Sequence, residues 1–293
     1  MRNFLTFLSV SNRFRPSSWL AVSLLTLSLI SGWNRAQAET PQGFAGATSG
    51  NSRAQAQTAP SQIQNLLAQI DAAANRHDVN ALLQFYSQNF TNSDGLTRLT
   101  MAKTLTQLWQ RYPNLKYQTQ LQSWQSEGKG YLLQTVTSIT GTQSGTNRNM
   151  ALNSTIKSQQ RLESQKISQQ AILAERSQLS TGTKPPLVEV NLPQQVKTGQ
   201  RYEFDAIVQK PLSEGYLIGA ATEEPVQANK YLNSSPVALE LLPSGGLFKQ
   251  GQAPTKPQSL WVSGVLIGNG GMTLVTQRLQ VVGGNTTTNT TSP

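Results

Sequence analysis

Six carboxylates between residues 60 and 182 are the groups with which this part of the chain could perform acid–base chemistry. Four of them stand at predicted turns or helix caps, where a carboxylate is structurally useful: Asp78, Asp94, Glu127 and Glu163. Asp71 follows Ile70 on the polar face of a predicted helix. Glu175 lies in a predicted strand and can face the interior as a general base, with Tyr117 or Tyr131 as the hydrogen-bond donor. Glu175 is therefore the single candidate for a catalytic residue.

Other kinds of catalytic or metal site find little support. His77 is the only histidine and the chain has no cysteine, so the ligand set of a zinc site is missing. A Ser-His-Asp triad would have to use His77, which falls in a predicted exposed turn, and no Gly-x-Ser-x-Gly elbow occurs. Phosphate-binding loops and dinucleotide fingerprints are absent as well. The sequence predicts no metal site and no cofactor.

The charge pattern argues against nucleic acid as a partner. Lys and Arg outnumber Asp and Glu by 24 to 14, which gives a formal net charge of +10. The basic residues are scattered singly, without the stripe and readout motif of a nucleic-acid binder. Only 13% of residues are charged, and Gln, Ser, Thr and Asn take their place. Such a surface contains few titrating groups and suits an extracytoplasmic setting.

The first 38 residues have the layout of a secretory signal peptide. Three arginines precede an apolar stretch over residues 19–30, and the Ala-Gln-Ala at 36–38 matches the pattern that signal peptidase cleaves. The stretch is shorter than the about 20 residues of a membrane span, although an uncleaved anchor stays open as the alternative. No later segment is apolar enough to cross a bilayer. We expect an exported protein, periplasmic or extracellular, whose mature chain begins at Glu39.

Residues 39–59 are rich in small and polar residues and predict a flexible linker. Apolar spacing then predicts three helices: Ser61 to about Asn75 with a Ser61–Gln64 capping box, a short helix capped by Asp78 that reaches Tyr86, and 97–112 before Pro113. The period changes to two after Pro113. This change predicts four antiparallel strands with one polar face: 115–122, 131–140, 149–162 and 167–179.

The stretches IQNLLAQIDAAANRHDVNALLQFYSQNF and DGLTRLTMAKTLTQLWQRYPNL, followed by the hairpin RLESQKISQQAIL, resemble the nuclear transport factor 2-like superfamily. Polyketide cyclases and ketosteroid isomerase belong to this superfamily. Gln165 stands where a glycine is usual in the hairpin. For residues 60–182 the resemblance implies an α+β cone, in which three helices pack on a curved antiparallel sheet around a pocket. It implies aromatic residues near that pocket, or filling the cone as core: Trp109, Tyr112, Tyr117, Trp124 and Tyr131.

Residues 183–283 predict an all-β second domain after the stiff Lys184-Pro185-Pro186 boundary. Six short apolar runs are separated by Pro, Gly and Asn, and Asn269-Gly270-Gly271 is a strong hairpin signal. The runs are 188–192, 202–208, 216–221, 237–242, 260–267 and 274–282. Their spacing resembles an immunoglobulin-like β-sandwich, in which Trp261 would fill the core. Residues 284–293 predict a disordered tail.

These observations favour an exported, non-catalytic binding or interaction protein of the cell envelope. Its partner would be an apolar small molecule held in the cone or an envelope protein that contacts the sandwich. Two alternatives stay open. One is an isomerase- or cyclase-type enzyme that uses Glu175 and a pocket tyrosine, since ketosteroid isomerase works with carboxyl groups in an apolar pocket. The other is a structural spacer or a homodimer formed through the cone-domain sheet.

Overall fold

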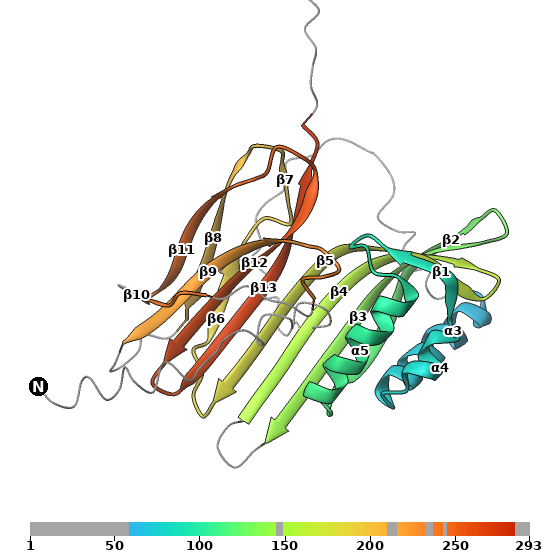
Figure 1. Ribbon diagram of the computed structural model, residues 1–293, viewed down its shortest axis with the longest axis horizontal. Helices are drawn as coiled ribbons and strands as arrows, with labels where there is room; N and C mark the ends of the chain where they lie inside the picture. The colour runs from blue at the N-terminus through green and yellow to red at the C-terminus, as the bar shows by residue number, and fades with distance from the viewer. Residues whose placement is uncertain (1–58, 145–148, 210–215, 232–236, 243–244, 285–293) are drawn as a thin grey trace, which may run out of the picture. The chain divides into compact units, whose positions relative to one another are not determined.

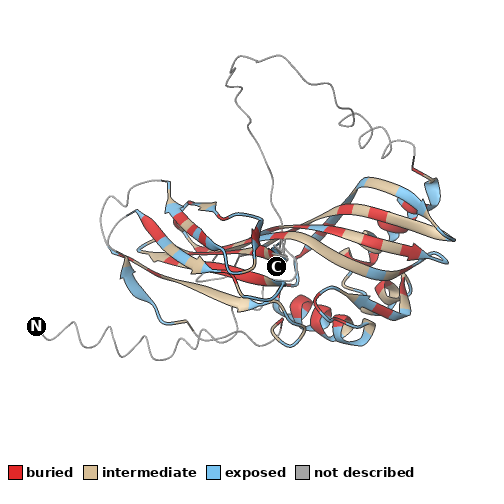
Figure 2. Cartoon of the chain, turned by 90° about the horizontal axis from the view of Figure 1, so that it is seen from above, coloured by how far each residue is buried: buried red, intermediate tan, exposed pale blue. Residues whose placement is uncertain are grey.

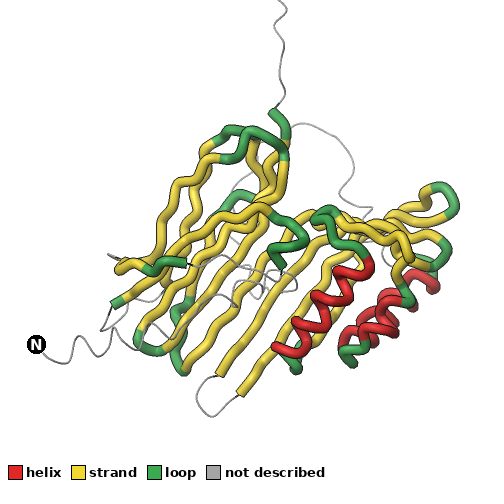
Figure 3. Tube along the Cα trace, viewed as in Figure 1, coloured by secondary structure: helices red, strands yellow, loops and turns green. Residues whose placement is uncertain are grey.

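The computed structural model describes residues 59–144, 149–209, 216–231, 237–242 and 245–284. The expected signal peptide lies outside these residues, as do all but one residue of the expected linker and all but one of the expected tail. Tertiary contacts divide the chain into two compact units. Residues 59–143 and 152–173 form one, the helical unit, and residues 174–284 with 149–151 form the other, the strand unit. Figure 3 shows mostly strand with a few helices.

Helix α3 (Ser61–Asn75) opens the helical unit. Its N-cap is Pro60, without a side-chain hydrogen bond, so the predicted Ser61–Gln64 capping box is wrong. Pro60 has φ −51° and ψ 135°, and its carbonyl accepts a 2.9 Å hydrogen bond from the Ile63 N–H. Ile63, Leu66 and Leu67 are buried in one stripe, as their spacing predicts.

The segment after α3 was only partly predictable. Asp78 caps α4 (Val79–Leu83) by accepting a 2.9 Å hydrogen bond from the Ala81 N–H, as predicted. The expected extension of this helix to Tyr86 is wrong, because Tyr86 opens strand β1 (Tyr86–Asn92). Tyr86 and Phe90 are both buried and stand four residues apart. That spacing places two residues on one side of a helix and also on one side of a strand.

Helix α5 (Arg98–Arg111) confirms the third predicted helix. Thr97 and Thr100 form a reciprocal capping box, in which each side chain bonds the other residue's backbone N–H. The buried stripe of α5 contains Met101, Leu105 and Trp109. Pro113 follows the helix and prevents its continuation.

Four long strands form the sheet of the helical unit, as the sequence predicts. They are β2 (Lys116–Glu127), β3 (Gly130–Ser144), β4 (Asn149–Glu163) and β5 (Lys166–Gly182), in the spatial order β2-β3-β4-β5. β1 pairs with β5 in parallel. Figures 1 and 2 show the helices gathered on one side of this sheet. The unit is thus a mostly antiparallel sheet with helices on one face, and the cone remains a prediction.

The tight turn between β4 and β5 places two ordinary residues in the left-handed region. Ser164 has φ 48° and Gln165 has φ 59°. Two consecutive positive φ values are typical of a type I′ hairpin turn, which prefers Asn-Gly. Gln165, the residue that replaces the usual glycine, therefore occupies a position where a side chain costs conformational energy.

The strand unit contains two sheets. One has the order β10-β9-β12-β13 and continues with residues 174–182 of β5, while β7 pairs with the end of β13. The other has the order β11-β8-β6. The bounds are β6 (Val188–Asn191), β7 (Gln195–Lys197), β8 (Arg201–Val208), β9 (Leu217–Pro225), β10 (Glu240–Leu242), β11 (Gly246–Gln252), β12 (Gln258–Gly268) and β13 (Gly271–Val282). All six predicted runs contain strands, and the Gly268–Gly271 pair confirms the predicted hairpin. β7 and β11 were not predicted.

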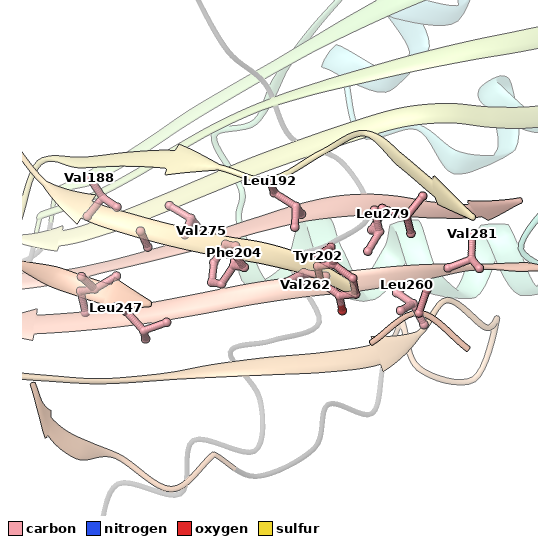
Figure 4. Close-up of a cluster of buried hydrophobic side chains, with 14 of the residues drawn as sticks. Val188, Leu192, Tyr202, Phe204, Leu247, Leu260, Val262, Val275, Leu279 and Val281 are labelled. Carbon is pink, nitrogen blue, oxygen red and sulfur yellow. The ribbon is translucent and has the colours of Figure 1, made fainter. Parts of the chain in front are cut away.

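Side chains from both sheets of the strand unit share one apolar core (Figure 4). Tyr202 and Phe204 of β8 and Val262 of β12 lie in it. Gly264 packs closely beside them, because a Cβ there would lie 3.0 Å from the Phe204 ring. Trp261 is a buried core residue, as the sequence predicts, but it alternates with Val262, faces the opposite side of the sheet and lies outside this cluster. Nothing in this arrangement supports the immunoglobulin resemblance.

Candidate functional site

Trp109 of α5 and Tyr117 of β2 form a buried polar contact in the helical unit. The indole Nε1–H donates a 2.7 Å hydrogen bond to the Tyr117 hydroxyl, and the two rings meet edge to face. Burial is the main cause that raises the pKa of Tyr117, although the Trp109 hydrogen bond acts in the opposite direction. The hydroxyl is therefore neutral at physiological pH. Both polar atoms have a partner, as a packed core requires.

His77 lies against this pair and is less exposed than the sequence predicts. Its ring stacks on Trp109 with centroids 5.1 Å apart, and its Nε2 is 3.3 Å from the Leu115 carbonyl oxygen. The backbone of His77 has φ 55°, which ends α3 with a left-handed residue. These contacts give His77 a structural role in joining α3, α5 and the start of β2.

The remaining three predicted aromatic residues lie in two other places. Trp124 and Tyr131 meet edge to face across the β2–β3 hairpin, and Gln62 of α3 donates a 2.9 Å hydrogen bond to the Tyr131 hydroxyl. Tyr112, after α5, is buried, and this burial is the main cause that raises its pKa. The structure thus joins the five candidates as two separate pairs and a single residue. Whether any of them lines a ligand pocket stays a prediction.

Asp71 and Asn75 were not predicted as site residues, yet both form hydrogen bonds with the backbone at the outer edge of β2. Asp71 accepts hydrogen bonds from the Thr119 N–H at 2.6 Å and the Thr119 hydroxyl at 2.7 Å. Asn75, one helical turn later, accepts from the Tyr117 N–H at 2.7 Å and donates to the Tyr117 carbonyl at 2.9 Å. The two side chains replace a neighbouring strand and protect the edge. Only their i, i+4 spacing could have indicated this role.

Asp71 also affects the buried tyrosine of β1. Burial raises the pKa of Asp71 above its ordinary value of 3.8, and the hydrogen bonds from Thr119 oppose that shift. Burial, and secondarily the charge of Asp71, raises the pKa of Tyr86 to about 12. A carboxyl and a phenol with raised pKa values resemble an acid–base pair. The carboxyl is already engaged by Thr119, so its present contacts are structural.

The other carboxylates of residues 60–173 also have structural contacts. Asp78 caps a helix, and Asp94 accepts a 3.0 Å hydrogen bond from the Ser93 hydroxyl in the turn before α5. Arg161 bridges Glu127 at 3.0 Å and Glu163 at 3.9 Å on the β2–β3 and β4–β5 hairpins. Each of these carboxylates thus has at least one structural contact, although Glu127 Oε2 has no hydrogen-bond partner among the described residues.

Glu175, the predicted base, belongs to the strand unit and is deeply buried. Its Oε2 accepts hydrogen bonds from Trp261 Nε1 at 3.1 Å and from Arg278 Nη2 at 3.0 Å. The side chains of Glu175 and Arg278 are 2% and 1% exposed. An ion pair of this kind stabilises the charged carboxylate and occupies one of its two oxygens. The proposed donors Tyr117 and Tyr131 belong to the helical unit and bond to other groups. The contacts of Glu175 are therefore structural, and its role as a base stays an untested prediction.

Neutral polar side chains interrupt the buried face of β3 and β4. Ser154, Ser158 and Gln160 alternate with buried apolar residues along β4, and Thr135 is fully buried in β3. Gln170 donates a 3.2 Å hydrogen bond to the Ser158 hydroxyl. Within the described residues, Thr135 Oγ1 and Gln160 Oε1 have no hydrogen-bond partner. This face can offer neutral hydrogen-bonding groups to a ligand. The sequence analysis did not identify these residues, although the period-two pattern of the strands places them on the buried face.

Two further kinds of feature are absent from the described residues. No group of three or more His, Cys, Asp and Glu side chains there could hold a metal ion. Among the same residues, no helix has the length and apolar character required to span a membrane.

Comparisons with known proteins assign no activity. A family model described as a domain of unknown function, DUF8623, matches residues 183–282. No curated protein matches the sequence. The matched stretch begins after β5, so it leaves out the β5 residues that pair with β13.

Solved structures resemble part of the chain at low similarity. Bd1075 from Bdellovibrio bacteriovorus has 15% identity and a TM-score of 0.29, over 38% of this chain and 39% of its own. A protein assigned to the SnoaL-like polyketide cyclases, from Shewanella putrefaciens, has 13% identity and a TM-score of 0.28, over 39% and 89%. A ketosteroid isomerase-like fold from Catenulispora acidiphila, solved with trimethylamine, has 11% identity and a TM-score of 0.26, over 36% and 82%. The neighbours include the fold class that the sequence resembles, and similarity this low identifies neither an activity nor a substrate.

Proposed function

We propose that this chain is an exported, non-catalytic binding or interaction protein of the cell envelope. One observation carries the proposal: each of the six carboxylates that the sequence offers as acids or bases is engaged in a cap, turn, edge or ion pair. An enzyme of the isomerase type needs at least one carboxyl group free to exchange a proton with its substrate. A protein that only binds its ligand does not need a free carboxyl group.

The ligand of the proposed binding site is a small molecule with an apolar body and a neutral polar group. We place it in the cone that the helical unit would form. The apolar and hydroxyl side chains of β3 and β4 support this choice, because they alternate on one buried face. The buried polar side chains in the described parts of β3 and β4 are Thr135, Ser154, Ser158 and Gln160, all of them uncharged, which favours a neutral ligand. An envelope protein that contacts the strand unit is the other partner.

Native mass spectrometry of the protein purified from its own cell envelope tests binding directly. We expect an added mass that disappears on denaturation, and its value would identify the ligand class. A matched variant, Ser158→Ala, removes the hydroxyl and adds no bulk at this buried position, so it should retain less of this mass. A clean apoprotein mass in repeated preparations would contradict the ligand and favour a scaffold.

The enzyme alternative depends on Glu175 or on the Asp71–Tyr86 pair. The pair is the stronger observation, because burial raises both pKa values. Turnover of a ligand found by mass spectrometry would be measured for Glu175→Gln and Tyr86→Phe. Product formation that Tyr86→Phe abolishes, in a variant that still binds the ligand, would replace the binding proposal with the enzyme.

Export is proposed on the leader alone. N-terminal sequencing of the protein from the envelope should begin at Glu39, the residue after the Ala-Gln-Ala motif. A chain that begins at Met1 and remains with the membrane would show an uncleaved anchor instead. A homodimer through the cone-domain sheet would appear in sedimentation as a defined dimer that neither salt nor dilution readily separates.

A further inference from the structure

The outward face of sheet β11-β8-β6 exposes three apolar side chains. Leu187, Ile207 and Phe248 are 49%, 39% and 64% exposed. Ile207 pairs with Gly246 and Phe248 pairs with Asp205, so the two apolar side chains are diagonal neighbours on one face. Leu187 precedes β6 and bonds the Gln209 N–H through its carbonyl, which extends the row to the third strand. We call these three residues the apolar strip.

Carboxylates surround the apolar strip. Glu189 pairs with Ile207, and Glu203 and Asp205 alternate with the buried residues of β8 on the same face. Arg201 is the one cation among the β8 residues of this face. The face is therefore acidic although the chain has a formal net charge of +10. Two copies of this face would bring like charges together, so a symmetric pairing through it is disfavoured.

Helix α5 of the helical unit has the opposite character. It buries Met101, Leu105 and Trp109 and leaves Leu99 80% exposed on its outer side. Lys103 is exposed one turn after Leu99 and lies on the same side. The helix carries three cations and no carboxylate. It thus presents an apolar anchor beside a positive charge.

We propose that the chain self-associates head to tail, with α5 of one copy docked on the acidic face and apolar strip of a second copy. Burial of Leu99 and Phe248 would supply the attraction, and Lys103 opposite the carboxylates would set the orientation. The contact is heterologous, so a pair of copies leaves α5 unused on one copy and the acidic face unused on the other. It needs neither a ligand in the cone nor a dimer through the cone-domain sheet.

Sedimentation velocity of the chain from Glu39 onward, at several concentrations and two salt levels, tests this inference. We expect concentration-dependent association at about 0.02 M salt that weakens at about 0.5 M, because the Debye length shortens several-fold. Phe248→Ser, Lys103→Glu and Glu203→Lys should each weaken association by about tenfold or more. Two control variants, Leu241→Ser on β10 and Lys157→Glu on β4, change exposed residues outside both surfaces and should associate normally.

A mixing experiment separates a specific contact from general charge attraction. The Lys103→Glu chain and the Glu203→Lys chain repel their own copies. When the two are mixed, the carboxylate introduced at position 103 of one chain faces the ammonium introduced at position 203 of the other, and the native Lys103 of the second chain faces the native Glu203 of the first. Both contacts join only unlike chains, so association should return in the mixture, as a complex that contains the two chains in equal amounts. A protein that stays monomeric at every concentration would overturn the inference. Association that Phe248→Ser leaves unchanged, or a mixture with no complex, would overturn it as well.

Discussion

The side chain of Asp71 both fixes a strand edge and changes how the stability of the fold depends on pH. It holds the edge of β2 through Thr119, and that contact keeps a carboxyl group in a partly desolvated place. Burial raises its pKa, so the folded protein binds a proton at Asp71 more readily than the unfolded chain does. Asp71 therefore stabilises the fold fully below its ordinary pKa and loses this contribution as pH rises through the raised value.

Replacing Asp71 with Asn should remove this pH dependence. The variant keeps an acceptor for the Thr119 N–H and loses the titrating proton. We expect the wild type to gain stability relative to Asp71→Asn as pH falls from neutral toward 3.8. Urea unfolding at a series of pH values measures the difference in the free energy of unfolding. Two profiles that run parallel across this range would contradict the assignment.

The residue types in these contacts could be read from the sequence, but their partners could not. The aromatic candidates Trp109 and Tyr117 are close enough in sequence to be guessed as neighbours. Asp71 and Thr119 are 48 residues apart, and Glu175 and Arg278 are 103 apart. Only the pairing of strands and helices brings such residues together. For this reason the sequence identified Glu175 as a catalytic candidate without indicating its ion pair.

At the scale of elements, the tight turn of the β4–β5 hairpin holds two non-glycine residues at positive φ, a backbone conformation that costs energy. The strands on either side hold the turn in place, since both continue for many residues beyond it. A hairpin with this geometry becomes more stable when the turn residue has no Cβ.

Gln165→Gly should therefore stabilise the protein by about 1 kcal/mol, because the left-handed conformation costs a residue with a side chain about 1–2 kcal/mol. Thermal and urea unfolding measure the gain. Gln118→Gly in β2 is the matched control, since it makes the same replacement in extended backbone and should destabilise by about 0.5–1 kcal/mol. A loss of stability in Gln165→Gly would show that its side chain makes an unrecognised contribution.

Three strands of the strand unit are joined by a buried polar row. Trp261 of β12 pairs with Arg278 of β13, and Glu175 of β5 accepts hydrogen bonds from both. Removing one partner of such a pair leaves a buried charge without compensation. Arg278→Met should thus destabilise by about 3–5 kcal/mol.

The double variant Glu175→Gln/Arg278→Met should recover most of this loss. It removes both charges, and the glutamine oxygen can still accept from Trp261. Urea unfolding of the two single variants and the double variant gives the coupling energy. A double variant that is as unstable as Arg278→Met would show that the row acts through packing and not through charge.

Most elements were predictable because their apolar periodicity was long. The helices α3 and α5 and the strands β2 to β5 each span at least 12 residues. β7 has three residues, too few to show a period, and β11 has the sequence GLFKQGQ, whose glycines reduce its strand character. β1 was hidden by the ambiguous spacing of Tyr86 and Phe90. The sequence therefore predicted the long helices and strands better than it predicted the short strands or the register.

At the scale of the molecule, β5 contributes residues to both units. Its first half belongs to the helical unit, and residues 174–182 belong to the strand unit. The matched family stretch 183–282 leaves this second half out, together with Glu175. A fragment cut at the proline-rich boundary would lose the strand next to β13 and the partner of Arg278.

A fragment of residues 174–284 should therefore be more stable than one of residues 183–284. The longer fragment keeps the β5–β13 pairing and the Glu175–Arg278 ion pair, whose loss alone costs about 3–5 kcal/mol. Circular dichroism and urea unfolding of both fragments measure the difference. Equal stability would mean that the strand unit needs no contribution from β5.

The division of β5 between the two units also matters during biosynthesis. Residues 176–182 of β5 leave the ribosome early, while their partners 271–277 of β13 follow about 90 residues later. At about 5–20 residues per second, the nascent chain keeps this strand edge without its neighbour for about 5–20 s. During that interval the edge is open to other chains. A chaperone that covers this edge would have the most to protect at that stage.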